Sequence, residues 1–156
     1  VSDITFIETR EGFLYLAVIL DLYSRAIVGW SMSHKIDEVL VQDALTMAVD
    51  RRALKNGLLL HSDQGSQYKS KGYQQRIKSL NMICSMSRKG ECHDNAVAES
   101  FFHSLKTELI NDHVYQNRSV ARQEIFKYIE IFYNRKRRHS TLHYQAPLNF
   151  EIMNAA

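Results

Sequence analysis

Three acidic residues occupy positions where an ionised carboxylate is energetically unfavourable. Asp3 interrupts an apolar strand pattern, Asp63 directly follows a short apolar run, and Glu99 borders the apolar stripe of a helix pattern. Carboxylates that are directed at one place repel each other, so a cation has to neutralise them. Ligation by carboxylates suits Mg²⁺ or Mn²⁺, and two such ions about 3.5–4 Å apart can support phosphodiester chemistry. Composition alone leaves open that these are three unrelated surface acids.

The spacing of the acids, and the residues around them, are more specific than their number. Asp3 precedes Asp63 by 60 positions, and 35 residues lie between Asp63 and Glu99. Lys106 follows Glu99 by seven positions, which is two helical turns and roughly 10 Å along the same face. The flanking motifs are residues 61–68 (HSDQGSQY), residues 85–90 (SMSRKG), Asp94 to Ala96, residues 99–102 (ESFF), and Tyr133, Asn134, His139, Ser140, Leu142 and Pro147. Together they resemble the Asp-Asp-Glu core of retroviral integrases and of bacterial insertion-sequence transposases with an integrase core domain.

This resemblance spans almost the whole chain and implies both a fold and an activity. The implied fold is ribonuclease-H-like α/β, with helices flanking a five-stranded mixed sheet whose first three strands are antiparallel. Asp3, Asp63 and Glu99 would be the catalytic residues and would hold two Mg²⁺ or Mn²⁺ ions. Water would nick DNA at a transposon end, and the freed 3′ hydroxyl would then attack a phosphodiester of target DNA. Such proteins act as multimers on paired ends, so a homo-oligomer is expected, with no membrane partner and no small-molecule cofactor.

Basic residues in three places are candidates for DNA contact. By resemblance Lys106 would bind phosphate near the site, although a lysine that extends from a helix surface is the alternative. A loop that contains Gly90 carries Arg88 and Lys89, which could grip DNA or form a solvated turn. The densest basic run could bind phosphates in a salt-dependent way or place favourable charge at a helix C-terminus, and we favour DNA contact. That run consists of Arg135, Lys136, Arg137 and Arg138.

Polar residues next to the three acids are candidates for a supporting role. Asn95 shares a helix face with Glu99, and His61 and Gln64 flank Asp63 in the sequence. Each could position the site or, for His61, move a proton. A half-buried, hydrogen-bonded histidine is the simpler expectation for His61.

Two further aspartates could compete as ligands. Asp21 would lie near Asp3 if the first two strands pair as a hairpin, but we expect it to cap a turn instead. Asp94 immediately precedes the helix that carries Glu99, and a helix N-cap is its expected role.

Residue patterns predict the elements that position these side chains. Asp37 is expected to cap the first helix and Asn56-Gly57 to end it. The other predicted elements are strands over residues 3–8, 13–20, 26–32, 58–61 and 82–85, and helices over 70–80, 94–110 and 119–135. This order indicates an α/β fold with a mixed sheet covered by helices. We expect one catalytic core domain over residues 1–156, with a basic helical extension from about residue 119.

Composition narrows the class of protein without choosing a function. The chain has 156 residues, 45% of them hydrophobic and 24% charged, which excludes a disordered or fibrous protein. Its net charge of +3 permits a nucleic acid partner without requiring one. Its two cysteines, Cys84 and Cys92, form neither a disulfide framework nor a zinc motif, which fits a reducing, cytoplasmic compartment. Because the chain opens on a strand without a methionine, we expect a piece of a longer protein, without the family's helix-turn-helix region.

Three other functions remain as alternatives to a transposase core. A related nuclease would use the same carboxylates without rejoining DNA. A non-catalytic DNA-binding or assembly module would need no metal. A glycosidase would use two carboxylates without a metal or a basic face, so metal dependence would exclude it.

Overall fold

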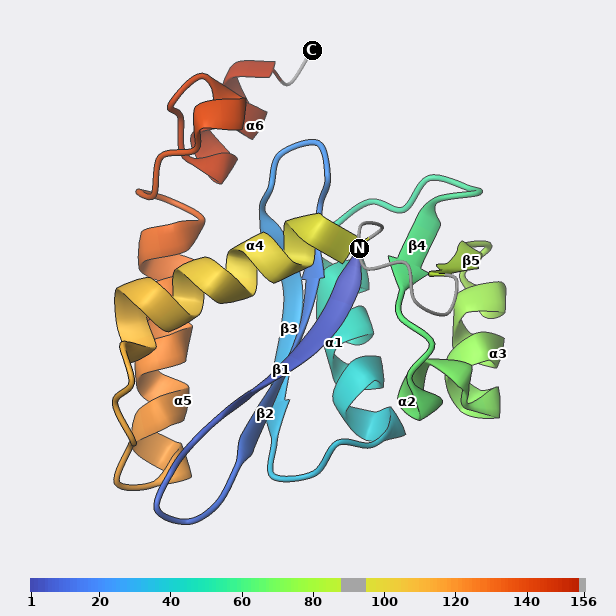
Figure 1. The fold of residues 1–156 in the computed structure, drawn as a ribbon. Helices are drawn as coiled ribbons and strands as arrows, with labels where there is room; N and C mark the ends of the chain where they lie inside the picture. The colour runs from blue at the N-terminus through green and yellow to red at the C-terminus, as the bar shows by residue number, and fades with distance from the viewer. Residues whose placement is uncertain (88–94, 155–156) are drawn as a thin grey trace.

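The computed structural model describes residues 1–87 and 95–154, and its strands form two groups (Figure 1). β1 (Ser2–Ile7), β2 (Leu14–Leu20) and β3 (Ile27–Ser33) form an antiparallel sheet in chain order, as predicted. β4 (Leu59–Ser62) and β5 (Ile83–Met86) form a parallel pair. β1 and β4 contact each other, but no hydrogen-bonded ladder joins them within the described ranges. The predicted five-stranded mixed sheet is therefore seen as a three-stranded sheet beside a two-stranded one.

Most of the continuous apolar run over residues 13–20 forms β2, a strand that is buried on both faces. Side chains alternate between the two faces of a strand. Leu16 and Val18 pack into one apolar layer, whereas Ala17 and Ile19 pack into the other. The sheet is therefore covered on both faces, as the run over residues 13–20 predicts.

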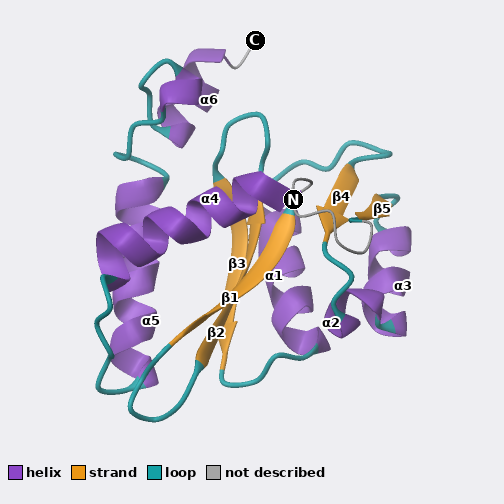
Figure 2. Cartoon of the chain, viewed as in Figure 1, coloured by secondary structure: helices purple, strands orange, loops and turns teal. Residues whose placement is uncertain are grey.

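Helices supply the two covering layers (Figures 1 and 2). α4 (Ala96–Leu105) and α5 (Arg118–Lys127) pack on one face of the sheet. α1 (Glu38–Arg51) packs on the other face, and α3 (Lys71–Ser79) adds side chains to the same layer. The molecule is thus a helix–sheet–helix sandwich, which agrees with the predicted α/β class.

The first helix begins where the sequence predicts but ends earlier. The Asp37 side chain accepts a hydrogen bond of 3.1 Å from the Leu40 N–H, which is an N-cap. The helix ends at Arg51, so the predicted end at Asn56-Gly57 is wrong. Arg52 adopts an extended backbone, and its guanidinium lies 2.6 Å from the Glu151 carboxylate. A distant ion pair at the helix end is not visible in the local pattern.

The remaining elements extend the predicted helices. α2 (Ser66–Lys69) is a single turn before α3. α4 continues as the π-helical segment η2 (Lys106–Ile110), and α5 continues as the π-helical segment η3 (Tyr128–Tyr133). The helices predicted over 94–110 and 119–135 are present in this composite form. The sequence pattern does not predict the short η4 (Ser140–Leu142) or α6 (Pro147–Asn154).

The C-terminal segment is fastened to the edge of the sheet. The Ile27 N–H donates to Asn134 Oδ1 at 2.9 Å, and Asn134 Nδ2 donates to the Ile27 carbonyl at 3.0 Å, so this buried amide acts like a strand partner. Tyr23, in the turn after β2, stacks on Phe150 of α6 with ring centroids 5.2 Å apart. None of the described helices is both long enough and apolar enough to cross a membrane.

Candidate active site

Asp3 lies near the start of β1 and is half-buried. The Ile4 N–H donates to Asp3 Oδ1 at 2.8 Å, which holds the carboxylate against its own strand. Its pKa is raised from 3.8 to about 6, chiefly by burial and further by the negative charges of Asp63 and Glu99, against the lowering effect of the Ile4 N–H. Asp3 is therefore a carboxyl that the fold keeps in an electrostatically unfavourable place.

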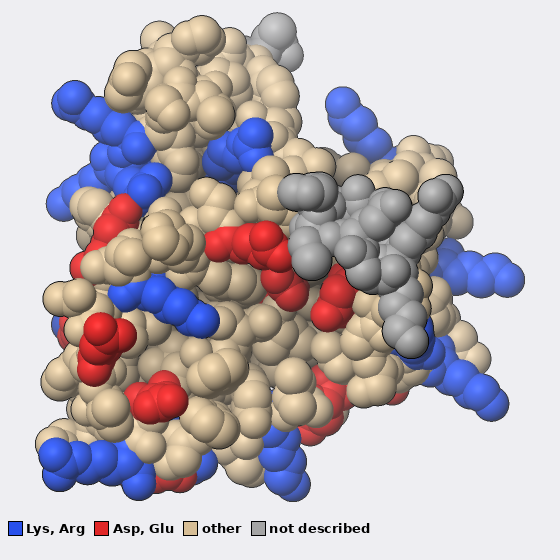
Figure 3. Space-filling view, viewed as in Figure 1, with Lys and Arg blue, Asp and Glu red and all other residues tan. Residues whose placement is uncertain are grey.

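Asp63 and Glu99 reach Asp3 from two other elements. Asp63 directly follows β4, where its Oδ1 accepts a 2.8 Å hydrogen bond from the Gly65 N–H, and Glu99 lies in the first turn of α4. Both side chains are exposed. β1 contacts both β4 and α4, so the three acids lie at one end of the molecule. Acidic side chains gather over the start of α4 (Figure 3), which lies close to the N-terminus of the chain (Figure 1).

No counter-charge offsets these acids within the described residues. The four ion pairs found in residues 1–87 and 95–154 all involve other carboxylates. The donor set is three carboxylates, which is the chemistry that a hard divalent cation requires. In the same ranges no three His, Cys, Asp or Glu side chains are close enough together to hold one ion. The acids thus fit a metal in type and charge, but they do not form a preassembled cage.

Side chains around Asp63 tie its turn to the end of β5. Both ring nitrogens of His61 lie 2.9 Å from serine hydroxyls, Nδ1 from Ser85 and Nε2 from Ser87. Gln64 Nε2 donates to the Ser87 carbonyl at 2.9 Å and so closes a second bridge. His61 is half-buried and fully hydrogen-bonded, which matches the simpler expectation for it.

Asn95 connects the start of α4 to β1. It is 7% exposed, and its Nδ2 donates to the Ser2 carbonyl at 3.4 Å, one residue before Asp3. Its Oδ1 is buried and has no hydrogen-bond partner among residues 1–87 and 95–154. The hydroxyls of Ser2 and Tyr68 lie 2.9 Å apart in the core and brace the strand beside Asp3. Neither residue was predicted to support the site, although Tyr68 ends the motif over residues 61–68 and Ser2 directly precedes Asp3.

The two competing aspartates have different outcomes. Asp21 Oδ1 accepts hydrogen bonds from the Tyr23 N–H at 2.7 Å and the Ser24 N–H at 3.4 Å, so the turn-capping prediction is confirmed. Asp94 lies outside the described residues, as do Arg88, Lys89 and Cys92. The N-cap position of α4 is occupied by Asn95, without a side-chain cap hydrogen bond.

The predicted basic residues occupy different environments. Lys106 is exposed, and its ammonium lies 5.4 Å from the centre of the Phe6 ring. Arg137 binds Glu108 through two nitrogens, with a shortest distance of 2.7 Å, and its Nη2 also donates to Ser104 Oγ at 3.0 Å. The other members of the C-terminal run are exposed: Arg135, Lys136 and Arg138. Arg137 thus forms an ion pair within the protein, whereas the neighbouring basic side chains are exposed to solvent.

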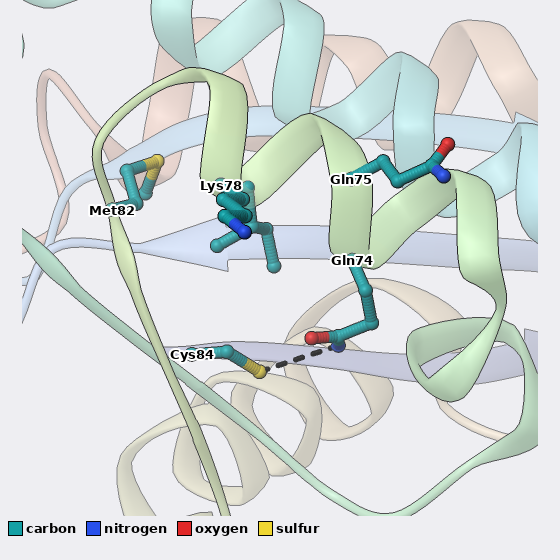
Figure 4. Close-up of a pocket in the computed structure, with 6 residues that line it drawn as sticks. Gln74, Gln75, Lys78, Met82 and Cys84 are labelled. Atoms are coloured by element: carbon teal, nitrogen blue, oxygen red, sulfur yellow. Dashed lines mark hydrogen bonds between the residues drawn. The ribbon is translucent and has the colours of Figure 1, made fainter.

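A separate hollow of about 280 Å³ lies between α3 and β5 (Figure 4). Gln74, Lys78, Met82 and Cys84 line it, and Gln74 Nε2 lies 3.4 Å from the Cys84 sulfur. None of the predicted site residues lines this hollow. The hollow is therefore separate from the three carboxylates.

Comparison with known proteins identifies the family of this chain. Residues 1–92 match a family model described as the integrase core domain, and residues 99–154 match a second model of the same description. The chain belongs to the integrase core domain family. The transposase for insertion sequence element IS904 of Lactococcus lactis is 51% identical to this core domain over 154 residues, 99% of the chain and 61% of that protein. Transposase InsF for insertion sequence IS3A of Escherichia coli K12 is 49% identical over 155 residues, 99% of the chain and 54% of that protein.

The core domain also resembles solved structures at low sequence identity. The HTLV-2 integrase catalytic core domain in complex with magnesium, in its trimeric form, has a TM-score of 0.70 at 16% identity, covering 96% of this chain and 92% of the other. A chain of the simian T-cell lymphotropic virus intasome, in complex with a PP2A regulatory subunit, has a TM-score of 0.73 at 15% identity over 96% and 52%. These likenesses establish the fold. The core domain spans little more than half the length of the transposases that it matches.

Proposed function

We propose that this chain is the catalytic core of an insertion-sequence transposase, a metal-dependent polynucleotidyl transferase. The observation that carries the proposal is the position of Asp63 and Glu99 close enough to Asp3 to raise its pKa, with no counter-charge among the described residues. The motif residues around these acids and the family membership support it.

Asp3, Asp63 and Glu99 would hold two divalent ions in the working complex. Bound Mg²⁺ or Mn²⁺ would supply activation of the attacking oxygen and stabilisation of the leaving oxygen. The protein's own contribution is to hold three carboxylates at one end of the sheet. The Ile4 N–H, the Asn95 amide and the His61 hydrogen bonds keep their strands and helix in place.

The proposed reaction has two balanced steps. In the first, the oxygen of water attacks the phosphorus at an element end, the bond to the 3′ oxygen breaks, and that oxygen leaves as a 3′ hydroxyl. In the second, this 3′ hydroxyl attacks a target phosphodiester and displaces the 3′ oxygen of the target strand. The number of phosphodiester bonds is conserved in the second step, so no outside energy source is required.

Basic residues would hold the DNA strands. Lys106, the first residue of η2, lies about 10 Å from Glu99 along the continuous helix and can reach a phosphate near the reacting bond. Lys136 and Arg138 can add phosphate contacts from the exposed C-terminal run, whereas Arg137 carries a structural ion pair. Arg88 and Lys89 remain predicted contacts from the sequence.

The partners and the complete sheet form the finer part of the proposal. The reaction needs element-end DNA and target DNA, and synapsis of two ends calls for a second copy of the chain. Action on a bacterial element would place it in the cytoplasm. β4 would complete a five-stranded mixed sheet beside β1, because the two strands already contact each other.

Cleavage and joining of labelled DNA test the proposal directly. We expect Mg²⁺- or Mn²⁺-dependent nicking of DNA that carries the ends of the encoding element, followed by transfer of the cut 3′ end. Asp63→Asn and Glu99→Gln should abolish both products, whereas Asp43→Asn, an exposed carboxyl on α1, should leave them unchanged. Full activity of Asp63→Asn would refute the assignment, and nicking without any joined product would indicate the related nuclease.

One observation favours the non-catalytic alternative. Within the described residues the carboxylates do not gather closely enough to hold an ion. Titration with Mn²⁺ in the presence of DNA decides between the two. Mn²⁺ binding that occurs in the wild type and disappears in Asp63→Asn supports the transposase. DNA binding that is unaffected by metal supports an assembly module.

A further inference from the structure

An aromatic surface lies on the β1–β2 hairpin, where two exposed phenylalanines adjoin a tyrosine that packs against the core. It consists of Phe6, Phe13 and Tyr15, and we call it the Phe6 surface. Phe6 and Phe13 are 47% and 46% exposed, and their rings meet edge to face with centroids 4.9 Å apart. Tyr15 is the cross-strand partner of Phe6, and its ring centroid lies 6.3 Å from that of Phe13. Neighbouring rings therefore hold Phe6 in place while much of it faces solvent.

A basic side chain covers the Phe6 ring. The Lys106 ammonium lies 5.4 Å from the ring centre, within the range of a cation–π contact. In the same direction along β1, Glu8 is exposed two residues beyond Phe6. Its negative charge would repel phosphate, so the charge at the Phe6 surface that favours a nucleic acid strand is that of Lys106.

The distance from the Phe6 surface to the carboxylates matches a short stretch of DNA. Phe6 follows Asp3 by three strand positions, about 10 Å, an odd offset that places the two side chains on opposite faces of β1. The link between them is Lys106, which lies seven helical positions and roughly 10 Å beyond Glu99 and reaches the Phe6 ring from that side. One DNA strand advances about 3.4 Å per nucleotide in a duplex, so 10 Å corresponds to about three nucleotides. A strand whose phosphate reacts at the carboxylates would therefore bring a nearby nucleotide to Phe6.

We propose that the Phe6 surface stacks an unpaired base of the reacting DNA strand, about three nucleotides from the scissile phosphate. Lys106 leaves the ring when DNA binds and contacts a phosphate of the same strand. Only an unpaired base can reach Phe6, because bases within a duplex are already stacked on their neighbours. The inference rests on the proposed function and adds a preference for DNA that is locally unpaired beside the reacting bond.

Fluorescence of a duplex with a short single-stranded tail tests the stacking. The tail carries 2-aminopurine at successive positions, and Ca²⁺ replaces Mg²⁺ so that the strand is not cut. Phe6→Ala should weaken binding of the tailed duplex by roughly 5- to 150-fold and abolish the 2-aminopurine signal at one position, since stacking contributes that much per base. Binding of a fully paired duplex should change less than about twofold. Phe6→Tyr should retain the wild-type behaviour.

Phe126→Ala is the matched control. Phe126 is also 47% exposed and contacts Trp30 with ring centroids 6.0 Å apart, but it lies on α5. It should bind both DNAs as the wild type does. Equal loss of affinity for paired and tailed DNA in Phe6→Ala would overturn the inference, and so would a loss confined to self-association in light scattering, which would assign the surface to a second copy. Failure of the wild type to bind or cut any DNA would instead refute the proposed function.

Discussion

The carboxylate end of the molecule and the Glu108–Arg137 pair differ in whether negative charge is balanced by a neighbouring positive charge. At the carboxylate end, Asp3, Asp63 and Glu99 are placed near one another with no opposite charge among the described residues, and the pKa of Asp3 is raised as a result. At the pair, burial raises the pKa of Glu108, but hydrogen bonds from Arg137 and Tyr128 outweigh it and leave the pKa below its usual value. Compensated charge stabilises the fold, whereas uncompensated charge marks a place where a ligand must supply the balance.

Asp3→Asn tests the comparison most strongly, because activity and stability should move in opposite directions. We expect strand cleavage to fall by roughly 10³-fold or more, since a group that holds the ions is removed. In the absence of metal, the variant should be more stable at pH 7 by up to about 3 kcal/mol, because about two pKa units of unfavourable ionisation disappear.

The pH dependence of stability checks the sign of this effect. The folded-state pKa of Asp3, about 6, lies above its usual 3.8, so its contribution to stability is complete below pH 3.8 and is lost as pH rises through 6. Urea unfolding of the metal-free protein should show this loss in the wild type and its absence in Asp3→Asn. A variant that is less stable than the wild type at pH 7 would contradict the interpretation.

Arg137→Met should be destabilising without a specific effect on DNA contact. Removing one partner leaves Glu108 partly buried and unpaired, since its side chain is only 33% exposed. We expect a loss of about 1–2 kcal/mol in thermal or urea unfolding, less than for a fully buried pair because water screens the site. The double variant Arg137→Met/Glu108→Gln should recover part of that stability. No such recovery is expected if Arg137 is a surface arginine that does not interact with Glu108.

Arg138→Met should show the converse behaviour. Arg138 is exposed, so its removal should leave the free energy of unfolding within about 0.5 kcal/mol of the wild type. If it binds phosphate, the slope of log affinity against log salt should decrease by about 0.9. An unchanged slope in a salt titration of DNA binding would remove Arg138 from the proposed contacts.

The smallest predicted loss of stability comes from His139, and its dependence on pH is opposite to that of Asp3. Its pKa is lowered to about 4, chiefly by burial and further by the positive charges of Arg137 and Arg25, against the opposing effect of Glu108. Because the folded-state pKa lies below the usual 6.5, stability is lost as pH falls from 6.5 through 4. The loss should be roughly 1 kcal/mol, since the ring is half exposed to screening. His139→Phe should remove it in acid unfolding experiments, whereas His34→Gln, on an exposed residue, should not.

Local structure was largely predictable because its causes lie within a few residues. The run over 13–20 predicts a strand covered on both faces, Asp37 predicts a helix cap, and Asp21 predicts a turn. Their hydrogen bonds and their periodicity involve neighbours in the chain. The end of α1 was mispredicted, and the contact made there, an ion pair of Arg52 with Glu151, joins residues 99 positions apart and lies outside any local pattern.

The candidate site was predictable in its residues but not in its arrangement. Motif spacing selects Asp3, Asp63 and Glu99, yet their approach depends on β1 packing against both β4 and α4. The exposed Phe6 surface escaped notice because Phe6 alternates with core residues in an ordinary strand pattern. Its exposure is visible only in the folded chain, where 47% of Phe6 remains accessible to solvent.

The sequence by itself determined which residues can do chemistry, which segments form strands and helices, and which family the chain resembles. Tertiary structure alone decided which charges meet. Arg137 and Arg138 are adjacent and chemically identical, but only Arg137 finds Glu108, 29 positions away. The physical reason is that backbone patterns are set by local hydrogen bonds and side-chain periodicity, whereas the energy of a charge depends on distant groups that folding brings within a few ångströms.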